Sequence, residues 1–445
     1  MTGRTERTEG VPGPRSMTDT GGVGSGAICV DVGSTYTKAC LVDLDSGALV
    51  RRVEVPTTAE SDVLVGLDAA VAELDAHAPL YVCSSAGGGL RLAVVGYESL
   101  VTAEAGHRVG LSAGAQVVHV AAGPLDGRAV AALRASRPDV ILLVGGTDGG
   151  DASVLLHNAG RLATSRLRVP VVVAGNADAR EQAAGVLSAR GVPVTVTGNV
   201  LPRIGVLDPG PARAAIRQMF LRHVIGGKRL SRGQRFASLV RAATPDAVLA
   251  AVELLADRTG AGVLVVDVGG ATTDVYSALV PDAEAEAGPR RDVAGTLWRS
   301  RTVEGDLGVR AGAAGVVAAA AAEKLESPDI TGGPPFDTGT DRRLAAVAAT
   351  VALRRHARGH APGPGLPRTG GRDLRDVRLV VGSGGVLRHG GGAQVLDAVL
   401  GDTAGGWAAP AGARRTIDTA YVLAAAGLLA AEHPAAAAGL LDTLR

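Results

Sequence analysis

Two segments of the sequence combine an aspartate, a glycine and hydroxyl side chains in the same order. Residues 30–37 read V-D-V-G-S-T-Y-T and residues 266–273 read V-D-V-G-G-A-T-T, so Asp31 corresponds to Asp267 and Gly33 to Gly269. Glycine lets backbone N–H groups approach an anion closely, and carboxylate oxygens are ligands that Mg²⁺ prefers. The pattern is typical of a tight turn that binds phosphate beside a magnesium ion held through water.

The repetition of this turn strengthens the prediction. One copy alone would be explained equally well by an ordinary hairpin with a polar turn. Two copies in register, each after an apolar run, indicate a duplicated unit, and their wide separation favours two similar lobes over a solenoid. Two such turns facing each other would bind a polyphosphate from both sides. The predicted phosphate-binding residues are Asp31, Gly33, Ser34, Thr35, Thr37 and Lys38 in the first copy and Gly269, Gly270, Thr272 and Thr273 in the second, with Asp31 and Asp267 as magnesium ligands.

Several charged residues have both a chemical and a structural interpretation. Lys38 could place a compact charge near phosphate or be a solvated strand residue. Asp274, at the same position of the second copy, could orient water or cap a strand. Asp148 lies in a Gly-rich loop after an apolar strand, where α/β sheets place functional groups, and could position an attacking water, although surface-turn chemistry explains it equally well. Asp148 and Asp267 are the candidate catalytic residues.

A third glycine motif, V-V-G-S-G-G-V-L, covers residues 380–387. It follows an apolar strand and precedes a helical pattern, a position at which glycines allow close approach of a flat ring or a phosphate. Its spacing matches neither the Rossmann fingerprint nor the Walker A loop. Its predicted nucleotide-binding residues are Gly382, Ser383, Gly384 and Gly385.

The elements that must position these motifs alternate between short apolar strands and helical patterns such as residues 62–74 and 179–189. This alternation is the signature of an α/β fold. The last predicted helix covers residues 418–432, with Asp418 as its N-cap. Residues 282–289, 327–341 and 354–376 are predicted to be exposed loops, so His356 and His360 are assigned to a solvated loop and not to a helical metal site. The predicted strands cover residues 28–32, 39–43, 80–84, 117–121, 140–144, 171–174, 194–197, 263–266 and 378–381.

Composition excludes several classes of protein. The 445 residues carry a formal net charge of +1, and aromatic residues make up 2%, which argues against a nucleic-acid scaffold and predicts a core of Val, Leu, Ile and Ala. The three cysteines cannot make a disulfide framework and fit a reducing cytoplasm. No apolar run reaches the ~18–20 residues that span a bilayer. Residues 1–25 lack a secretory signal pattern and are predicted to be a disordered tail.

The three motifs occur in the order seen in the actin/Hsp70/sugar-kinase superfamily and resemble its phosphate-1, phosphate-2 and adenosine motifs. The segment D-T-A-Y-V-L-A-A-A-G-L at residues 418–428 resembles the helix that follows the adenosine motif there. This resemblance implies an α/β, two-lobed, actin-like or Hsp70-like ATPase fold of duplicated ribonuclease H-like domains, with a nucleotide cleft between the lobes. The implied lobes are residues 26–262 plus 412–445, and residues 263–411.

A more detailed resemblance is to the MutL/GlmL family, the accessory proteins of adenosylcobalamin-dependent glutamate (methylaspartate) mutase, which is distinct from the mismatch-repair protein of the same letters. It implies a chaperone-like factor that binds ATP and Mg²⁺, is at most a slow ATPase, and acts on such a mutase, for example by releasing damaged cofactor. A homodimer is compatible with this role. The strings that carry the resemblance include D-V-G-S-T-Y-T-K (31–38), C-S-S-A-G-G-G-L-R (83–91), L-V-G-G-T-D-G-G-D (143–151), V-D-V-G-G-A-T-T-D-V (266–275), E-G-D-L-G-V-R (304–310) and G-S-G-G-V-L-R-H (382–389).

Two other functions stay open on the sequence. The first is a small-molecule kinase of the same fold, and the second is a docking subunit of the mutase that does not hydrolyse nucleotide. An activator of a radical dehydratase would need cysteines that hold an iron–sulfur cluster between subunits. Cys29 and Cys40 lie in or near strands around the first turn and Cys83 is isolated, so we exclude that function.

Overall fold

The structure is a computed structural model that describes residues 25–87, 90–98, 101–113, 115–225, 230–280, 298–359, 368 and 371–445. The predicted tail, apart from Ser25, and the predicted loop at 282–289 lie outside these residues. Among the described residues, no helix combines the length and the apolar character that a membrane crossing requires.

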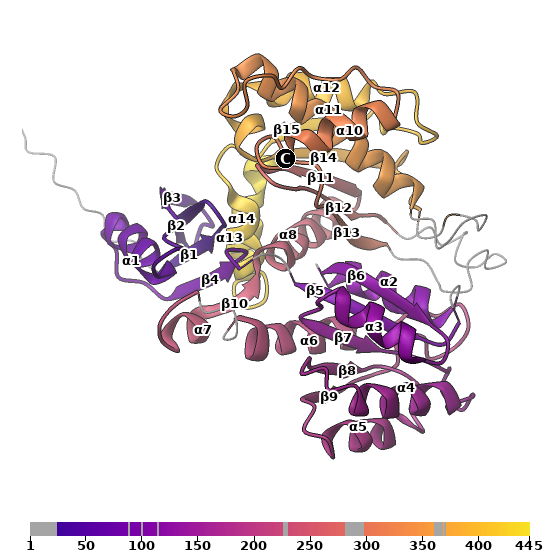
Figure 1. The fold of residues 1–445 in the computed structure, drawn as a ribbon. Helices are drawn as coiled ribbons and strands as arrows, with labels where there is room; N and C mark the ends of the chain where they lie inside the picture. The colour runs from indigo at the N-terminus through magenta and orange to yellow at the C-terminus, as the bar shows by residue number, and fades with distance from the viewer. Residues whose placement is uncertain are drawn as a thin grey trace, which may run out of the picture.

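Two sheets with the same strand order form the framework of the fold (Figure 1). In the first, β1 (Gly26–Val32), β2 (Tyr36–Asp43) and β3 (Leu49–Pro56) form an antiparallel meander, and β4 (Leu80–Ser84) and then β10 (Val240–Ala243) extend it in parallel. The second sheet repeats this plan. Its meander is β11 (Gly262–Val268), β12 (Thr273–Ala278) and β13 (Arg299–Glu304), and β14 (Val377–Ser383) and β15 (Arg414–Ile417) extend it. The predicted two-lobed fold with duplicated ribonuclease H-like units is confirmed.

A third sheet is inserted between β4 and β10. Its strands are all parallel, in the order β6-β5-β7-β8-β9, and Figure 1 shows it beside the second sheet. The strands of this third sheet and their helices fall within residues 26–262, which belong to the predicted first lobe. Strand β15 pairs in the second sheet, although its residues fall within 412–445 of the predicted first lobe. The lobe boundaries stay a prediction. The strands are β5 (Arg91–Gly96), β6 (Gln116–Ala122), β7 (Val140–Leu143), β8 (Val171–Val173) and β9 (Val194–Val196), with helices α2 (Thr102–Ser112), α3 (Gly127–Ala135), α4 (Ser153–Thr164), α5 (Arg180–Ser188) and α6 (Gly210–Met219).

The core that joins the two framework sheets is built around α8 (Thr244–Thr259) and α13 (Val422–Leu429). These helices pack against each other and against strands of both sheets, including β1, β4, β11 and β12. Val, Leu and Ala fill this core, as the composition predicts. Gly427 of α13 is needed for the close approach of the two helices, because a Cβ added there would lie 1.7 Å from the carbonyl oxygen of Ala247.

The predicted last helix is shorter in the structure. It begins at Val422, and a further helix, α14 (Pro434–Leu441), follows it. Asp418 still caps α13, because its carboxylate accepts hydrogen bonds from the backbone N–H groups of Val422 and Leu423 at 2.9 and 3.2 Å. A chain turn with Tyr421 at φ +55° separates the capping residue from the helix.

The predicted exposed loop at 354–376 is wrong in its first part. Helix α11 (Thr338–Arg358) continues through His356, and Gly359, at φ +70°, ends the helix. His356 is fully buried between Thr302 and Ser277, each 2.9 Å from one of its ring nitrogens, and burial lowers its pKa well below the usual value. A glycine at positive φ commonly terminates a helix, so Gly359 marks the end of α11 and does not argue against the helix before it.

Candidate functional site

The two repeated segments form the same hairpin turn. In the first, Asp31 pairs with Lys38 across β1 and β2, and the N–H of Gly33 donates to Tyr36 O at 3.1 Å. In the second, Asp267 pairs with Asp274 across β11 and β12, and the N–H of Gly269 donates to Thr272 O at 2.9 Å. A Cβ at Gly33 would lie 2.8 Å from Tyr36 O, so the turn requires glycine on steric grounds. The repeat seen in the sequence is therefore also a repeat of the hairpin structure.

The third glycine motif lies directly beside the second turn. Ser383, at the end of β14, is the register partner of Asp267 on β11. Gly384 follows with φ +103°, and a Cβ added to it would lie 2.2 Å from Val268 O. The motif thus packs its backbone against the strand that carries Asp267. The first sheet has Cys83 at the corresponding place, paired with Asp31.

One cavity lies where these motifs meet. It has a volume of about 40 Å³, which is room for about one or two water molecules. A water, a magnesium ion or a phosphate oxygen fits it, and a whole nucleotide does not. Three of the predicted phosphate-binding residues, Ser34, Thr35 and Gly270, are exposed. The polar side chains that line the cavity are those of Asp31, Lys38, Thr244, Asp267, Ser383, Asp418 and Tyr421.

Asp31 is held in place by three neighbours. Its carboxylate accepts a hydrogen bond from Thr244 Oγ1 at 2.5 Å and faces Lys38 Nζ at 3.8 Å, and the thiol of Cys83 lies 3.7 Å away. Burial acts to lower the pKa of Lys38, but the carboxylate of Asp31 and other neighbours outweigh it and raise the pKa. Lys38 is therefore a fixed cation in the cavity wall, and its place near phosphate stays a prediction.

The surroundings of Asp267 disfavour its charged form. Burial and the carboxylate of Asp274 raise its pKa to about 6, and Lys38 opposes the shift. No hydrogen bond to its side chain occurs within the described part of the chain. Such a carboxylate gains most from a cation, and Mg²⁺ would supply one.

The donor set fits Mg²⁺ better than a metal bound by protein alone. Among the described residues, no cluster of three or more His, Cys, Asp or Glu side chains is arranged to hold a metal ion. Mg²⁺ keeps several waters and is commonly bound by one or two carboxylates together with substrate phosphates. Asp31 and Asp267 provide two carboxylates in one cavity, and their role as magnesium ligands stays a prediction.

Two other predicted acids have structural partners. Asp274 forms an ion pair with the buried Arg301 at 2.5 Å, so its carboxylate holds β12 against β13. Asp148 follows β7 in the third sheet and does not line the cavity. Its carboxylate accepts hydrogen bonds at 2.9 Å from the backbone N–H of Ala177 and the side chain of Asn199. The structure therefore brings Asp267 to the other motifs and leaves Asp148 in a separate loop.

The sequence motifs do not predict Tyr421 as a site residue, although it lies in the string that resembles the last superfamily helix. Three cations surround its ring: Lys38 Nζ lies 4.3 Å from the ring centroid, and the guanidinium carbons of Arg52 and Arg388 lie at 5.2 and 4.8 Å. Arg388 also pairs with Glu54 at 3.0 Å. Since Arg388 follows β14 and Glu54 lies on β3, this pair connects the two framework sheets at the cavity.

Comparisons with known proteins agree on one family. The family model described as MutL protein matches residues 27–444. Protein MutL of Clostridium tetanomorphum is 34% identical to the chain, over 92% of this chain and 96% of that protein.

Two solved structures show a distant resemblance to the chain. An ATP-dependent caprolactamase from Pseudomonas jessenii is 14% identical, with 91% of this chain and 70% of that chain covered and a TM-score of 0.38. Xylulose kinase from Bifidobacterium adolescentis is 13% identical, with 94% and 93% covered and a TM-score of 0.32. At these TM-scores the duplicated sheets, and not the neighbours, carry the fold assignment.

Proposed function

The chain belongs to the MutL protein family, and from this premise and the geometry of the cavity we propose that it is an ATP-binding accessory factor of an adenosylcobalamin-dependent mutase, such as glutamate mutase, in the cytoplasm. The observation that carries the nucleotide part is the meeting of Asp31, Asp267 and Ser383 in one cavity. These residues come from both turns and from the third glycine motif, and therefore from both sheets.

In the proposed complex, the exposed turns hold the phosphates over the cavity. The tips of both hairpins face solvent at Ser34, Thr35 and Gly270, and the hydroxyls of Ser34 and Thr35 supply donors there. Asp31 and Asp267 would hold a magnesium ion whose other ligands are waters and phosphate oxygens, and Lys38 would supply a cation beside them. The glycines around Ser383 leave room for the flat adenine ring or its sugar.

The proposed switch is a change in the distance between the two framework sheets. A phosphate chain that touches both turns favours the closed arrangement, because only closure provides both sets of contacts. A ligand can shift such an equilibrium only by its differential affinity for the two states. The Arg388–Glu54 pair and the Tyr421 ring lie at this junction, so they would rearrange when a nucleotide enters. The mutase would sense that rearrangement.

The first experiment is calorimetric titration of the purified protein with Mg-ATP and with Mg-ADP, with released phosphate assayed in the same samples. Binding with slow hydrolysis, followed by nucleotide-dependent exchange of damaged cobalamin from a mutase, supports the proposal. Turnover of roughly 1–100 s⁻¹ on a small-molecule acceptor would instead identify a kinase. Absence of binding at about millimolar nucleotide, both alone and with a mutase present, would contradict the nucleotide part.

Gly384 provides a direct test of the third motif. Gly384→Ala places a Cβ 2.2 Å from Val268 O at a positive φ, so the motif must move away from β11. We expect Mg-ATP binding to weaken by about tenfold or more, equivalent to about 1.4 kcal/mol, in calorimetric titration. Gly412→Ala is the control, because Gly412 is exposed, lies outside the motif, and a Cβ there meets nothing within 4 Å, so this variant should leave the affinity unchanged. Equal affinities in the two folded variants would remove the motif from the nucleotide site.

A further inference from the structure

A second and larger cavity lies away from the nucleotide site. Its volume is about 410 Å³, within the ~300–1,000 Å³ range typical of small-molecule sites. One wall comes from α2 and the start of β6 in the third sheet, and the other from β13 and the end of α11 in the second lobe. Its charged lining consists of the five arginines Arg108, Arg355, Arg358, Arg368 and Arg372, with His107, against the two glutamates Glu304 and Glu323.

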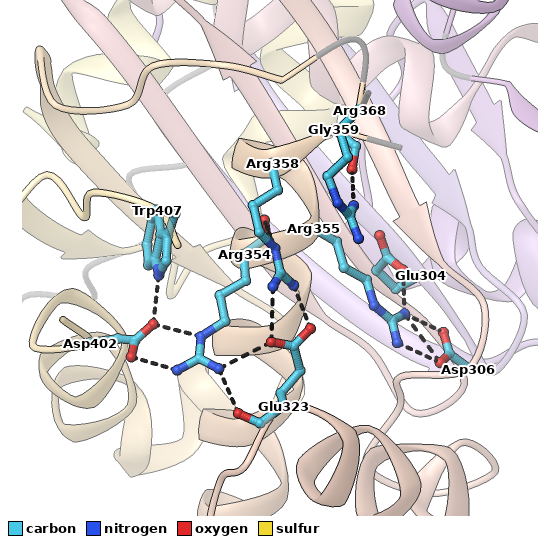
Figure 2. Close-up of polar contacts among 10 residues, drawn as sticks. All are labelled: Glu304, Asp306, Glu323, Arg354, Arg355, Arg358, Gly359, Arg368, Asp402 and Trp407. Carbon is cyan, nitrogen blue, oxygen red and sulfur yellow. Dashed lines mark hydrogen bonds and ion pairs between the residues drawn. The ribbon is translucent and has the colours of Figure 1, made fainter. Parts of the chain in front are cut away.

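The arginines of α11 are fixed by neighbouring acids before any ligand arrives (Figure 2). Arg358 donates through both terminal nitrogens to the carboxylate of Glu323. The fully buried Arg354 bridges Glu323 and Asp402, at 3.2 and 2.7 Å. Figure 2 shows these side chains side by side along one face of the helix. Their ordering entropy is already lost in the folded protein, which favours binding by preorganisation.

The other arginines of the cavity differ in how their charge is paired. Arg355 lies between Glu304 at 2.6 Å and Asp306 at 2.9 Å, and it is one-third exposed. Arg368 donates to the carbonyl of Gly359 at 2.7 Å, and no carboxylate of the described residues lies within 4.0 Å of it. Arg372 packs on the end of α11, where its side chain donates to the carbonyl of His356 at 3.2 Å. Burial and the nearby Arg108 lower its pKa to about 10, so it keeps its charge at neutral pH.

We propose that this cavity binds a small organic polyanion that carries two or more carboxylate or phosphate groups. Guanidinium groups match such oxyanions in planar, bidentate geometry. The five lining arginines outnumber by one the four carboxylates that line the cavity or pair with these arginines, which are Glu104, Glu304, Asp306 and Glu323. Leu111, Val117 and Val303 line the same cavity and offer apolar surface for a carbon skeleton. The proposal for this cavity does not depend on nucleotide binding at the other one. A bound ligand would contact both the third sheet and the second lobe.

The test is calorimetric titration of the full chain with citrate and, separately, with pyrophosphate, each without magnesium. Arg368→Gln and Arg355→Gln should each weaken binding by about tenfold, the loss of one charge-assisted contact. Glu304→Gln should strengthen binding several-fold, because it removes a like charge, and a folding defect would not produce this gain. Arg375→Gln is the control, since Arg375 is exposed, pairs with Asp373 and lies outside the cavity.

The two probes distinguish the source of the anion. Preference for citrate identifies a carboxylate ligand, and preference for pyrophosphate identifies a phosphate ligand. Competition of either probe with ATP that disappears in Gly384→Ala would place the binding at the nucleotide site and overturn the proposal. Absence of binding by both probes up to about 10 mM, or affinities that none of the three cavity variants changes, would also overturn it.

Discussion

Replacing Asp267 with asparagine is expected to weaken Mg-ATP binding by at least about tenfold and, in the same protein, to raise the free energy of unfolding of the ligand-free state at neutral pH. The two effects have one cause. Asp267 lies beside three other carboxylates, those of Asp274, Asp31 and Asp418, and all disfavour its charged form. A magnesium ion relieves that repulsion, whereas an asparagine removes both the repulsion and the magnesium ligand.

The sign of the pH dependence follows from the raised pKa. The folded protein holds the Asp267 proton up to about pH 6, whereas the ordinary value is 3.8. The folded state therefore binds this proton more tightly than the unfolded state, and the charged carboxylate destabilises the fold. That destabilisation is absent below about pH 4, grows between pH 4 and 6, and is complete above about pH 6. Asp267→Asn should remove it, with a gain of about 1–3 kcal/mol at pH 8 and little change at pH 4.

Denaturant unfolding at both pH values, together with calorimetric titration, measures these effects. In the unsubstituted protein, Mg-ATP affinity should fall as the pH drops through 6, because the proton competes with the magnesium ion. Asp376→Asn is the control, since Asp376 is exposed and does not line the cavity. A folded Asp267→Asn protein with unchanged affinity would exclude Asp267 from the site, and a loss of stability at pH 8 would contradict the electrostatic account.

Replacing Gly427 with alanine is expected to lower the free energy of unfolding more than Gly384→Ala or Gly160→Ala does. The new Cβ would lie 1.7 Å from Ala247 O and 2.5 Å from the carbonyl carbon, both backbone atoms of α8. The helices must separate, and α8 and α13 are the elements that connect the two framework sheets. We expect a loss of about 3 kcal/mol or more, since overpacking against backbone cannot be relieved by a rotamer change.

Thermal and denaturant unfolding measure the stabilities of the Gly427→Ala variant and of the control variant Gly160→Ala. Gly160 also lies inside a helix, α4, but a Cβ there meets nothing within 4 Å. Alanine is a better helix former by about 1 kcal/mol, so Gly160→Ala should be neutral or stabilising. Similar stabilities in the two variants would show that α8 and α13 do not pack as closely as the structure has them.

The sequence by itself determined the parts of this protein that depend on neighbours along the chain. The two Asp-Gly turns, the Gly382–Gly385 motif and most strands were predicted correctly, because a hairpin turn needs glycine at a fixed position and a buried strand needs a continuous apolar run. The duplication was also visible, since both copies keep the same residues in register. These features can be predicted without knowing which strands pair with one another.

Only the tertiary structure decided which distant residues meet. It places Tyr421 among Lys38, Arg52 and Arg388, buries Arg354 and His356 in a stretch that looked exposed, and gathers the arginines of the second cavity from α2, α11 and the residues beyond. Charged residues favour solvent on average, and they are buried only where an opposite charge is brought to them. Arg354 is paired with Asp402, a residue 48 positions away, and that encounter depends on the packing of the whole second lobe.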